Sequence, residues 1–303
     1  MIKGLTPRLP EVGQVRIGEK VAIRDGKTRP SKLDHFRLFG AERDANNDRV
    51  RDTVAEKALI EQTAQDKLTR LPIMFPFDSI DATFTTFRAF YTKTCAWCRS
   101  DNGTTATRKL KEGGIKEVAC PGDACEFSKP GGGCKPHGTL NFLIPGIQRG
   151  AGIYRFRTTS WNSINEILGG LAYIATLTNG ALANIPLALI VKPVRTSYVD
   201  KDGQTKATTI YVCNVTTDGA MDTWQQQALE HVRNRAALAT EFGQAQAVIR
   251  AAIAAPESPE DEKDLIDEFH PDAPEAPPVN GDSENAPAHQ GADAPESQDD
   301  LFS

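Results

Sequence analysis

Five of the six cysteines in this 303-residue chain lie within one stretch of forty residues. They are Cys95, Cys98, Cys120, Cys125 and Cys134. The surrounding sequence is rich in glycine and proline, and glycine lets a backbone wrap closely around an ion. Because thiolates from two short segments can converge on one tetrahedral Zn²⁺, the cluster predicts a cysteine-rich zinc module over residues 95–138. Free thiols, a redox pair and a four-cysteine iron–sulfur cluster are the alternatives.

Five thiols compete for the four ligand positions of such a site. Cys98 leads directly into the polar loop at residues 99–103, so it is preferred to Cys95, which is the alternative ligand. His137 is a possible substitute ligand, and Cys213 is expected in the core because it lies in an apolar strand. The predicted zinc ligands are Cys98, Cys120, Cys125 and Cys134.

The charge of the chain is divided between two parts. Residues 256–303 hold one of the 35 Lys+Arg and 15 of the 40 Asp+Glu, so residues 1–255 carry 34 and 25. The net charge is therefore +9 for residues 1–255 and −14 for residues 256–303. The acidic part also contains 8 of the 19 prolines, a composition that cannot bury a core. It is predicted to be a disordered tail whose tip, residues 301–303, binds another protein, with a simple solubilising tail as the alternative.

Residues 139–255 show the clearer secondary-structure pattern. Residues 152–158 alternate as a half-buried strand, and Ser163 with Glu166 reads as the capping box of a helix that ends near residue 178. Residues 185–194 and 208–215 are predicted to be paired strands. A helix is expected at residues 222–238, and the helical pattern resumes after Gly243 and runs to residue 255.

Residues 1–94 show a similar order of elements. A hairpin within residues 15–23, a strand at 32–38, a helix at 52–62 and a proline-containing edge strand at 71–77 are expected. The sequence thus predicts an α+β fold of mixed sheets with packed helices. Two β-α-β-like halves, residues 1–94 and 139–255, would flank the cysteine-rich module, with chance similarity of the halves as the alternative.

Basic residues near aromatic ones form a candidate surface for nucleic acid or a protein partner. Arg88 lies in the aromatic segment 84–91, Arg108 and Lys109 lie inside the module, and Arg155 and Arg157 share one strand face. Such side chains suit phosphate contacts and base stacking. Solvated faces with core aromatics behind them are the alternative.

Signatures of catalysis are missing from the sequence. The chain contains no G-x-G-x-x-G, H-E-x-x-H or G-x-S-x-G motif. A site with four cysteine ligands is closed and structural, because catalytic zinc keeps an open position. The sequence therefore predicts a protein that is not an enzyme.

A cytoplasmic location is expected, without membrane insertion. Clustered cysteines fit a metal site in a reducing compartment, and no apolar run follows Lys3 as it would in a secretory signal. The uncharged stretch 167–191 is divided by Asn179-Gly180, a turn signal.

The chain resembles the phage recombination directionality factor-like proteins, also described as phage metal-binding proteins. The resemblance spans roughly residues 2–238. It is carried by residues 2–10, Lys32-Leu33-Asp34-His35-Phe36, Cys95-x-Trp97-Cys98, Cys120-Pro121, Cys134-Lys135-Pro136-His137-Gly138-Thr139-Leu140 and Phe156-Arg157-Thr158-Thr159-Ser160-Trp161-Asn162-Ser163.

This resemblance implies an accessory role in prophage excision. Such a factor binds a large serine integrase and switches it from integration toward excision, while the integrase keeps the chemistry. The alternative from another class is a zinc-stabilised single-stranded-DNA-binding or replication accessory protein whose acidic tail recruits partners. A metal-dependent nuclease or hydrolase is a third possibility.

Overall fold

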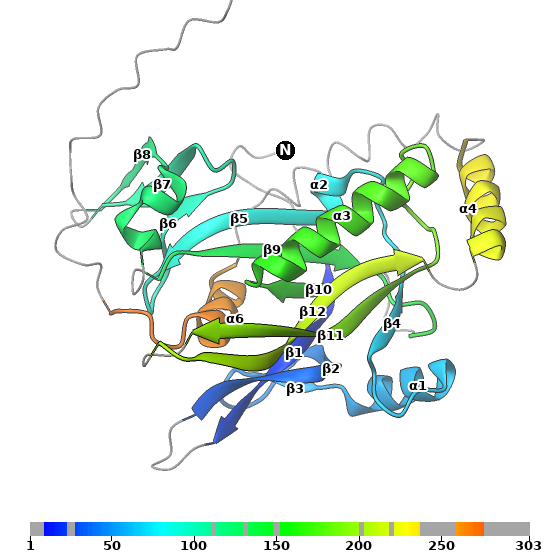
Figure 1. Cartoon of the computed structure of the whole chain (residues 1–303), viewed down its shortest axis with the longest axis horizontal. Helices are drawn as coiled ribbons and strands as arrows, with labels where there is room; N and C mark the ends of the chain where they lie inside the picture. Colours follow the sequence, from blue (N-terminus) through cyan, green and yellow to red (C-terminus); the bar gives the residue numbers. More distant parts are fainter. Residues whose placement is uncertain are drawn as a thin grey trace, which may run out of the picture.

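The computed structural model of the chain describes residues 9–22, 28–110, 113–129, 133–147, 152–199, 203–217, 221–236 and 258–275. These residues form two β-sheets with helices around them (Figure 1). The α+β expectation is confirmed. Within these residues, no helix is both long enough and apolar enough to cross a membrane.

The larger sheet has nine strands in the order β3-β2-β1-β10-β9-β5-β6-β7-β8. Its bounds, in chain order, are β1 (Glu11–Ala22), β2 (Thr28–Arg43), β3 (Arg49–Arg51), β5 (Phe84–Tyr91), β6 (Ala96–Ser100), β7 (Thr105–Lys109), β8 (Ile115–Ala119), β9 (Lys135–Phe142) and β10 (Ile153–Thr158). The strands of the cysteine module, β6 to β8, form one end of this sheet, and β2 and β3 form the other.

The smaller sheet has the order β12-β11-β4, with β4 (Arg70–Ile73), β11 (Leu187–Val199) and β12 (Thr205–Thr217). β4 lies at its edge, as its proline predicts. The helices are α1 (Thr53–Thr63), α2 (Ile80–Thr83), α3 (Trp161–Leu177), α4 (Met221–Ala236) and α6 (Pro259–Phe269). The helical pattern expected at 244–255 lies outside the described residues.

Strands from the two expected halves pair with one another in both sheets. β1, from the first half, pairs in parallel with β10, from the second. β4 adds in antiparallel fashion to β11. The expected hairpin within residues 15–23 is wrong, because residues 15–22 belong to the single strand β1, whose antiparallel partner is the long strand β2.

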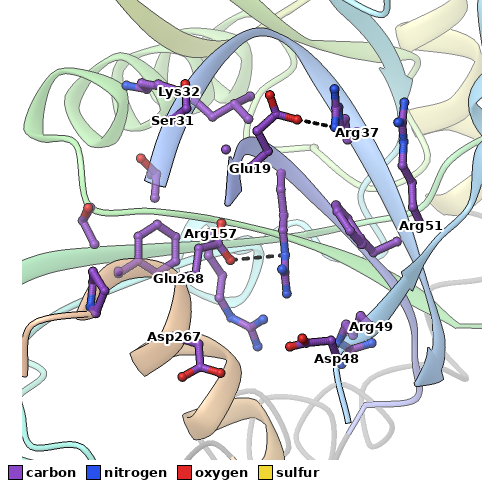
Figure 2. Close-up of a pocket in the computed structure, with 18 of the residues that line it drawn as sticks. Glu19, Ser31, Lys32, Arg37, Asp48, Arg49, Arg51, Arg157, Asp267 and Glu268 are labelled. Carbon is purple, nitrogen blue, oxygen red and sulfur yellow. Dashed lines mark ion pairs between the residues drawn. The ribbon is translucent and has the colours of Figure 1, made fainter. Parts of the chain in front are cut away.

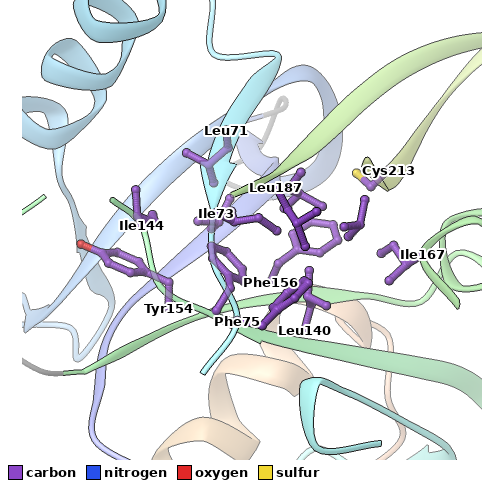
Figure 3. Packing of buried hydrophobic residues seen from close by; sticks show 14 of the residues in the cluster. Leu71, Ile73, Phe75, Leu140, Ile144, Tyr154, Phe156, Ile167, Leu187 and Cys213 are labelled. Atoms are coloured by element: carbon purple, nitrogen blue, oxygen red, sulfur yellow. The ribbon is translucent and has the colours of Figure 1, made fainter. Parts of the chain in front are cut away.

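The main core lies between the two sheets (Figure 3). Phe156 and Leu140 from the large sheet face Ile73 and Leu187 from the small sheet, and all four side chains are fully buried. α3 closes one side of this core with an apolar stripe at helical spacing, made of Ile164, Ile167, Leu171 and Ile174. Burying such a stripe, more than helix propensity, stabilises a helix of this length.

The start of α3 corrects the predicted capping box. Ser160, not Ser163, is the N-cap, and its side chain accepts a hydrogen bond from the Ser163 N–H. Ser163 is instead fully buried inside the helix, where its Oγ accepts a 3.1 Å hydrogen bond from the Cys213 N–H. Because β12 is an edge strand, this N–H has no strand partner on that side, so Ser163 attaches α3 to the small sheet.

Residues 258–275 correct the predicted disorder for part of the acidic tail. They form α6 and a short extension that pack on the face of the large sheet opposite the main core. Leu265 and Ile266 are buried there, with 1% and 5% of their surfaces exposed. Residues 276–303, including the expected binding tip, lie outside the described residues.

Candidate functional site

The first candidate site is a small cavity inside the cysteine module. Cys98 is in β6, Cys120 follows β8, Cys125 lies between two short 3₁₀ turns, and Cys134 precedes β9. Backbone hydrogen bonds fix these segments, with the Cys120 N–H donating to Thr104 O at 2.8 Å. The Cys134 N–H donates to Phe127 O at 2.7 Å. The turn-rich sequence thus brings four cysteines from distant positions to one end of the large sheet.

All four predicted ligands line this cavity, which has a volume of about 20 Å³. Cys95 is outside its lining, in the turn after β5, where its N–H donates to Thr92 Oγ1 at 3.3 Å. His137 is also elsewhere: its ring is buried on the sheet and stacks on Phe87. The structure therefore corrects the idea of His137 as a substitute ligand.

Aromatic packing shapes the wall of the cavity. The rings of Phe90 and Phe127 stack with centroids 4.6 Å apart. Gly133, next to Cys134, has φ +82, and a Cβ there would lie 3.3 Å from the Phe90 ring. A side chain at this position would be strained by both the backbone and the ring. Gly133 is therefore required for the approach to Cys134.

Two cations border the thiols. Burial raises the pKa of Cys98, and the hydrogen bond with Arg108 opposes the rise in part. Burial likewise raises the pKa of Cys134. Arg108 lies over the Phe127 ring at 5.0 Å, and Arg88 is ion-paired with Asp123. Burial therefore favours the neutral thiol forms of Cys98 and Cys134 unless a metal cation stabilises the thiolates.

The donor set of this cavity fits zinc. Four thiols around a space large enough for one small atom are the ligand chemistry of a closed structural site. Within the described ranges, the side chains as placed form no group of three or more histidine, cysteine, aspartate or glutamate residues that could hold a metal ion, so zinc binding would have to draw the four thiols together. Zn²⁺ bound there would cross-link β6, the 3₁₀ turns and β9.

The predicted basic surface divides between two places. Arg88 and Arg108 line the cysteine cavity, and Lys109 is half-buried at the end of β7. Arg155 and Arg157 lie on the opposite region of the large sheet, beneath α6, with side chains 15% and 5% exposed. The structure thus does not join the five residues into one open surface.

The second candidate site is a group of arginines beneath α6, here called the arginine face. Its members project from β1, β2, β3 and β10 on the side opposite the main core, and they are Arg16, Arg43, Arg49, Arg155 and Arg157. The alternation of β10 produces this placement, because Tyr154 and Phe156 enter the core while Arg155 and Arg157 face away from it.

Carboxylates of α6 pair with this face. Asp264 accepts hydrogen bonds from Arg43 and, at 3.0 Å, from Arg49. Asp261 lies 3.3 Å from Arg49 and 3.8 Å from Arg157. Burial raises the pKa of both carboxyls, but other contacts outweigh it, so both pKa values lie below the ordinary range. For Asp261 these are a hydrogen bond from Ser258 and the charges of the arginines, and for Asp264 the hydrogen bonds from Arg43 and Arg49.

Further ion pairs extend the network at both ends. Glu268 of α6 pairs with Arg16 at 3.2 Å. Glu11 adds a carboxylate from the large sheet itself: it lies in β1, 2.7 Å from Arg49 and 2.8 Å from Arg155. α6 therefore supplies three carboxylates to five arginines.

An aromatic pocket next to the arginine face receives the apolar side of α6. Ile266 packs on Phe87, Ala89 and Tyr91 of β5. His270, which follows the helix, contacts Tyr91 with their rings tilted by 43° and their centroids 4.7 Å apart. The helix thus presents carboxylates to one part of the sheet and apolar groups to another.

A histidine pair closes the end of the helix. His270 Nε2 lies 3.1 Å from His137 Nε2, so one neutral ring donates to the other. Burial lowers the pKa of His270 to about 4, and that of His137 lies well below its ordinary value for the same reason. Lys135 donates to Phe269 O at 2.7 Å, satisfying a carbonyl at the C-terminus of α6.

Beside the C-terminal part of α6 the arginine face remains hollow (Figure 2). The cavity has a volume of about 550 Å³, in the range of ligand sites. Arg37 and Arg51 extend its basic lining beyond the arginine face, and Asp267 and Glu268 form its wall on α6. Arg37 is held by Glu19 at 2.5 Å.

Local signals for α6 were present in the sequence. Ser258 is a standard N-cap residue, Pro259 suits the first helical position, and Glu260, Asp261 and Glu262 favour the first turn. The apolar residues Leu265, Ile266 and Phe269 follow at helical spacing. Averaging composition over residues 256–303 concealed this short amphipathic helix.

Comparison with known proteins gives one family. A model of the Gp3-like family, described as recombination directionality factor-like, matches residues 12–218. The match runs from β1 to the end of β12, so it includes both sheets, α3, the cysteine cavity and the arginine face, but not α6. No curated protein and no solved structure matches the chain.

Proposed function

The chain belongs to the recombination directionality factor-like family, and on that premise we propose that it binds a large serine integrase and biases it toward prophage excision. The family supports an accessory role in phage recombination. The more specific assignment, to a large serine integrase, rests on the family resemblance that segment 156–163 and the cysteine module carry. Cleavage and joining of DNA stay with the integrase.

Directionality of this kind requires only unequal binding. An accessory protein shifts an equilibrium by the difference between its affinities for the two states. About 3 kcal/mol of differential binding changes the ratio of the two integrase–DNA arrangements roughly 150-fold. No reacting group on this chain is needed, in keeping with a sequence that lacks a catalytic motif.

The single observation that carries the proposal is the family match over residues 12–218, about two thirds of the chain. The match covers the complete double-sheet body rather than one motif. Within that body, the proposed zinc would hold the cysteine module in shape, and the two sheets would present the recognition surfaces.

The proposal is tested by measuring affinity for defined integrase–DNA complexes. Purified full-length chain is titrated into integrase bound to the two sites that flank a prophage, and into integrase bound to the phage and host attachment sites. We expect tighter binding to the first complex. Equal affinities would overturn the proposal, and salt-sensitive binding to DNA without integrase would favour the single-stranded-DNA-binding alternative.

A further inference from the structure

α6 occupies a surface with two chemically different parts. Its carboxylates meet the arginine face, and Ile266 enters the aromatic pocket of β5. Backbone polar groups are also matched: the Ala96 N–H donates to Glu262 at 2.6 Å, and Lys135 donates to Phe269 O. The surface therefore recognises the side chains and the end of a helix together.

We propose that this surface is a docking site for an acidic amphipathic helix of a partner protein, and that α6 occupies it in cis. A partner helix would place carboxylates against Arg43, Arg49 and Arg157. An apolar side chain would take the place of Ile266 beside Tyr91. Amphipathic helices in grooves are a recurring mode of protein recognition.

The aromatic pocket favours a protein over nucleic acid as the partner. A phosphate backbone could satisfy the arginines, but it has nothing comparable to Ile266 for the pocket lined by Phe87 and Tyr91. The Ala96 N–H and the Lys135 ammonium are aligned with a side chain and a carbonyl of one helix. Matching all three features requires a folded peptide segment.

The arginine face and its adjoining cavity extend beyond the area that α6 covers, which leaves room for a partner helix. All five arginines lie within residues 12–218, which the family model matches, whereas α6 lies beyond them. The arginine face thus lies within the part of the chain that the family model matches, and the helix that covers it lies outside that part. The adjoining cavity of about 550 Å³ adds Arg37 and Arg51, which pair with Glu19 and Glu56 rather than with carboxylates of α6.

Competition with α6 sets a threshold for the partner. A segment tethered to its own site acts at an effective concentration on the order of mM, so a partner present at ~1 μM must bind roughly 1000-fold more tightly to displace it. The additional cations around the cavity offer such a partner contacts that α6 does not use. Docking would then depend on partner affinity and on anything that weakens α6.

The test uses the full-length chain and a labelled synthetic peptide of residues 258–275, the segment that fills the site in cis. Asp261→Asn with Asp264→Asn in the full chain weakens α6 without changing the surface. We expect fluorescence anisotropy to show the peptide binding this double variant at least about 10-fold more tightly than the wild-type chain. Adding Arg43→Gln to the double variant should abolish that gain.

Matched probes separate the partner classes. A scrambled peptide of the same composition should bind weakly, because it keeps the charge but loses the apolar spacing. Equal binding of the scrambled and native peptides, tighter binding of a short DNA duplex than of the peptide, or no peptide binding to the folded double variant would each overturn the proposal. A wild-type dimer that the double variant converts to monomers would also overturn it, by assigning the site to a second copy.

A second readout needs no variant. About 1 mM unlabelled peptide, matching the tether's effective concentration, should accelerate hydrogen exchange of the α6 amides in the wild-type chain and leave β9 and β10 unchanged. Unchanged exchange in α6 would contradict docking in trans. Neither experiment includes an integrase, so failure here and failure of the recombination role are distinguishable.

Discussion

Arg43 of β2 and Asp264 of α6 form a bidentate ion pair, with distances of 3.1 Å and 2.9 Å between their nitrogen and oxygen atoms. Only 15% and 8% of the two side chains are exposed, so water screens the pair weakly. A single carboxylate thus fixes the acidic helix to the β2 side of the large sheet, where it also meets Arg49.

Asp264→Asn should loosen α6. The change removes the charge that Arg43 and Arg49 bind, and hydrogen bonds to charged groups contribute about 1.5–3 kcal/mol each. We expect hydrogen exchange of residues 259–269 to accelerate accordingly while β10 remains protected. Glu275→Gln is the matched control, because its pair with Lys93 is exposed and should leave exchange unchanged. Equal protection in both variants would contradict the role of Asp264.

Acid should release the same helix. A histidine whose pKa is lowered by docking stabilises the docked state fully above about pH 6.5, and that contribution is lost as the pH falls toward the docked value. For His270 the docked value is about 4, with Lys135 nearby adding to the effect of burial. His137, which also faces Arg99 and Arg157, shifts in the same direction.

Exchange of α6 amides measured between pH 7 and pH 4.5, corrected for intrinsic rates, checks this expectation. Asp261 and Asp264 have lowered pKa values, so they remain ionised over most of this window. His270→Gln should reduce the pH dependence, since it removes one of the two titrating rings. Protection that stays constant down to pH 4.5 would show that the histidine pair does not control docking.

The cysteine cavity should bind one zinc ion per chain. Cys120→Ser should lose the metal and lower the melting temperature, because one of four tetrahedral ligands is gone. Cys95→Ser is the control with the closest sequence context: Cys95 lies outside the cavity, so metal content should not change. Elemental analysis of the purified chain and both variants makes the comparison. Metal-free wild-type protein with unchanged melting would refute the site.

Ser163→Ala should destabilise the fold through β12. The substitution leaves the Cys213 N–H buried without its hydrogen-bond acceptor, a loss of about 1–3 kcal/mol. Ser160→Ala removes the actual N-cap and should cost about 1 kcal/mol. Denaturant unfolding of both variants distinguishes the two roles. A harmless Ser163→Ala would mean that another group satisfies this N–H.

Local sequence pattern predicted the features of the fold that are determined by residues close together in the chain. The stripe from Ile164 to Ile174 follows helical periodicity, and it forms the buried side of α3. The alternation around Arg155 likewise predicted which residues of β10 leave the core. Spacing and turn residues also selected the four cysteines that line one cavity.

Contacts between distant segments could not be predicted from local sequence pattern. The parallel pairing of β1 with β10 depends on how the complete sheet closes, since neither strand carries a signal for the other. The same holds for Arg155 and Arg157, whose charge indicated a surface but whose cover comes from α6, about a hundred residues later. The position of α6 therefore depends on long-range ion pairs, which the composition of the chain does not predict.

The direction of recombination is the most direct test of the account. A purified large serine integrase is incubated with equal amounts of the substrates for integration and excision, and both products are quantified as this chain is added. The account predicts that the ratio of excision to integration product rises with chain concentration, and that the chain alone produces neither. A ratio that stays constant to saturation, or recombination by the chain without integrase, would contradict it.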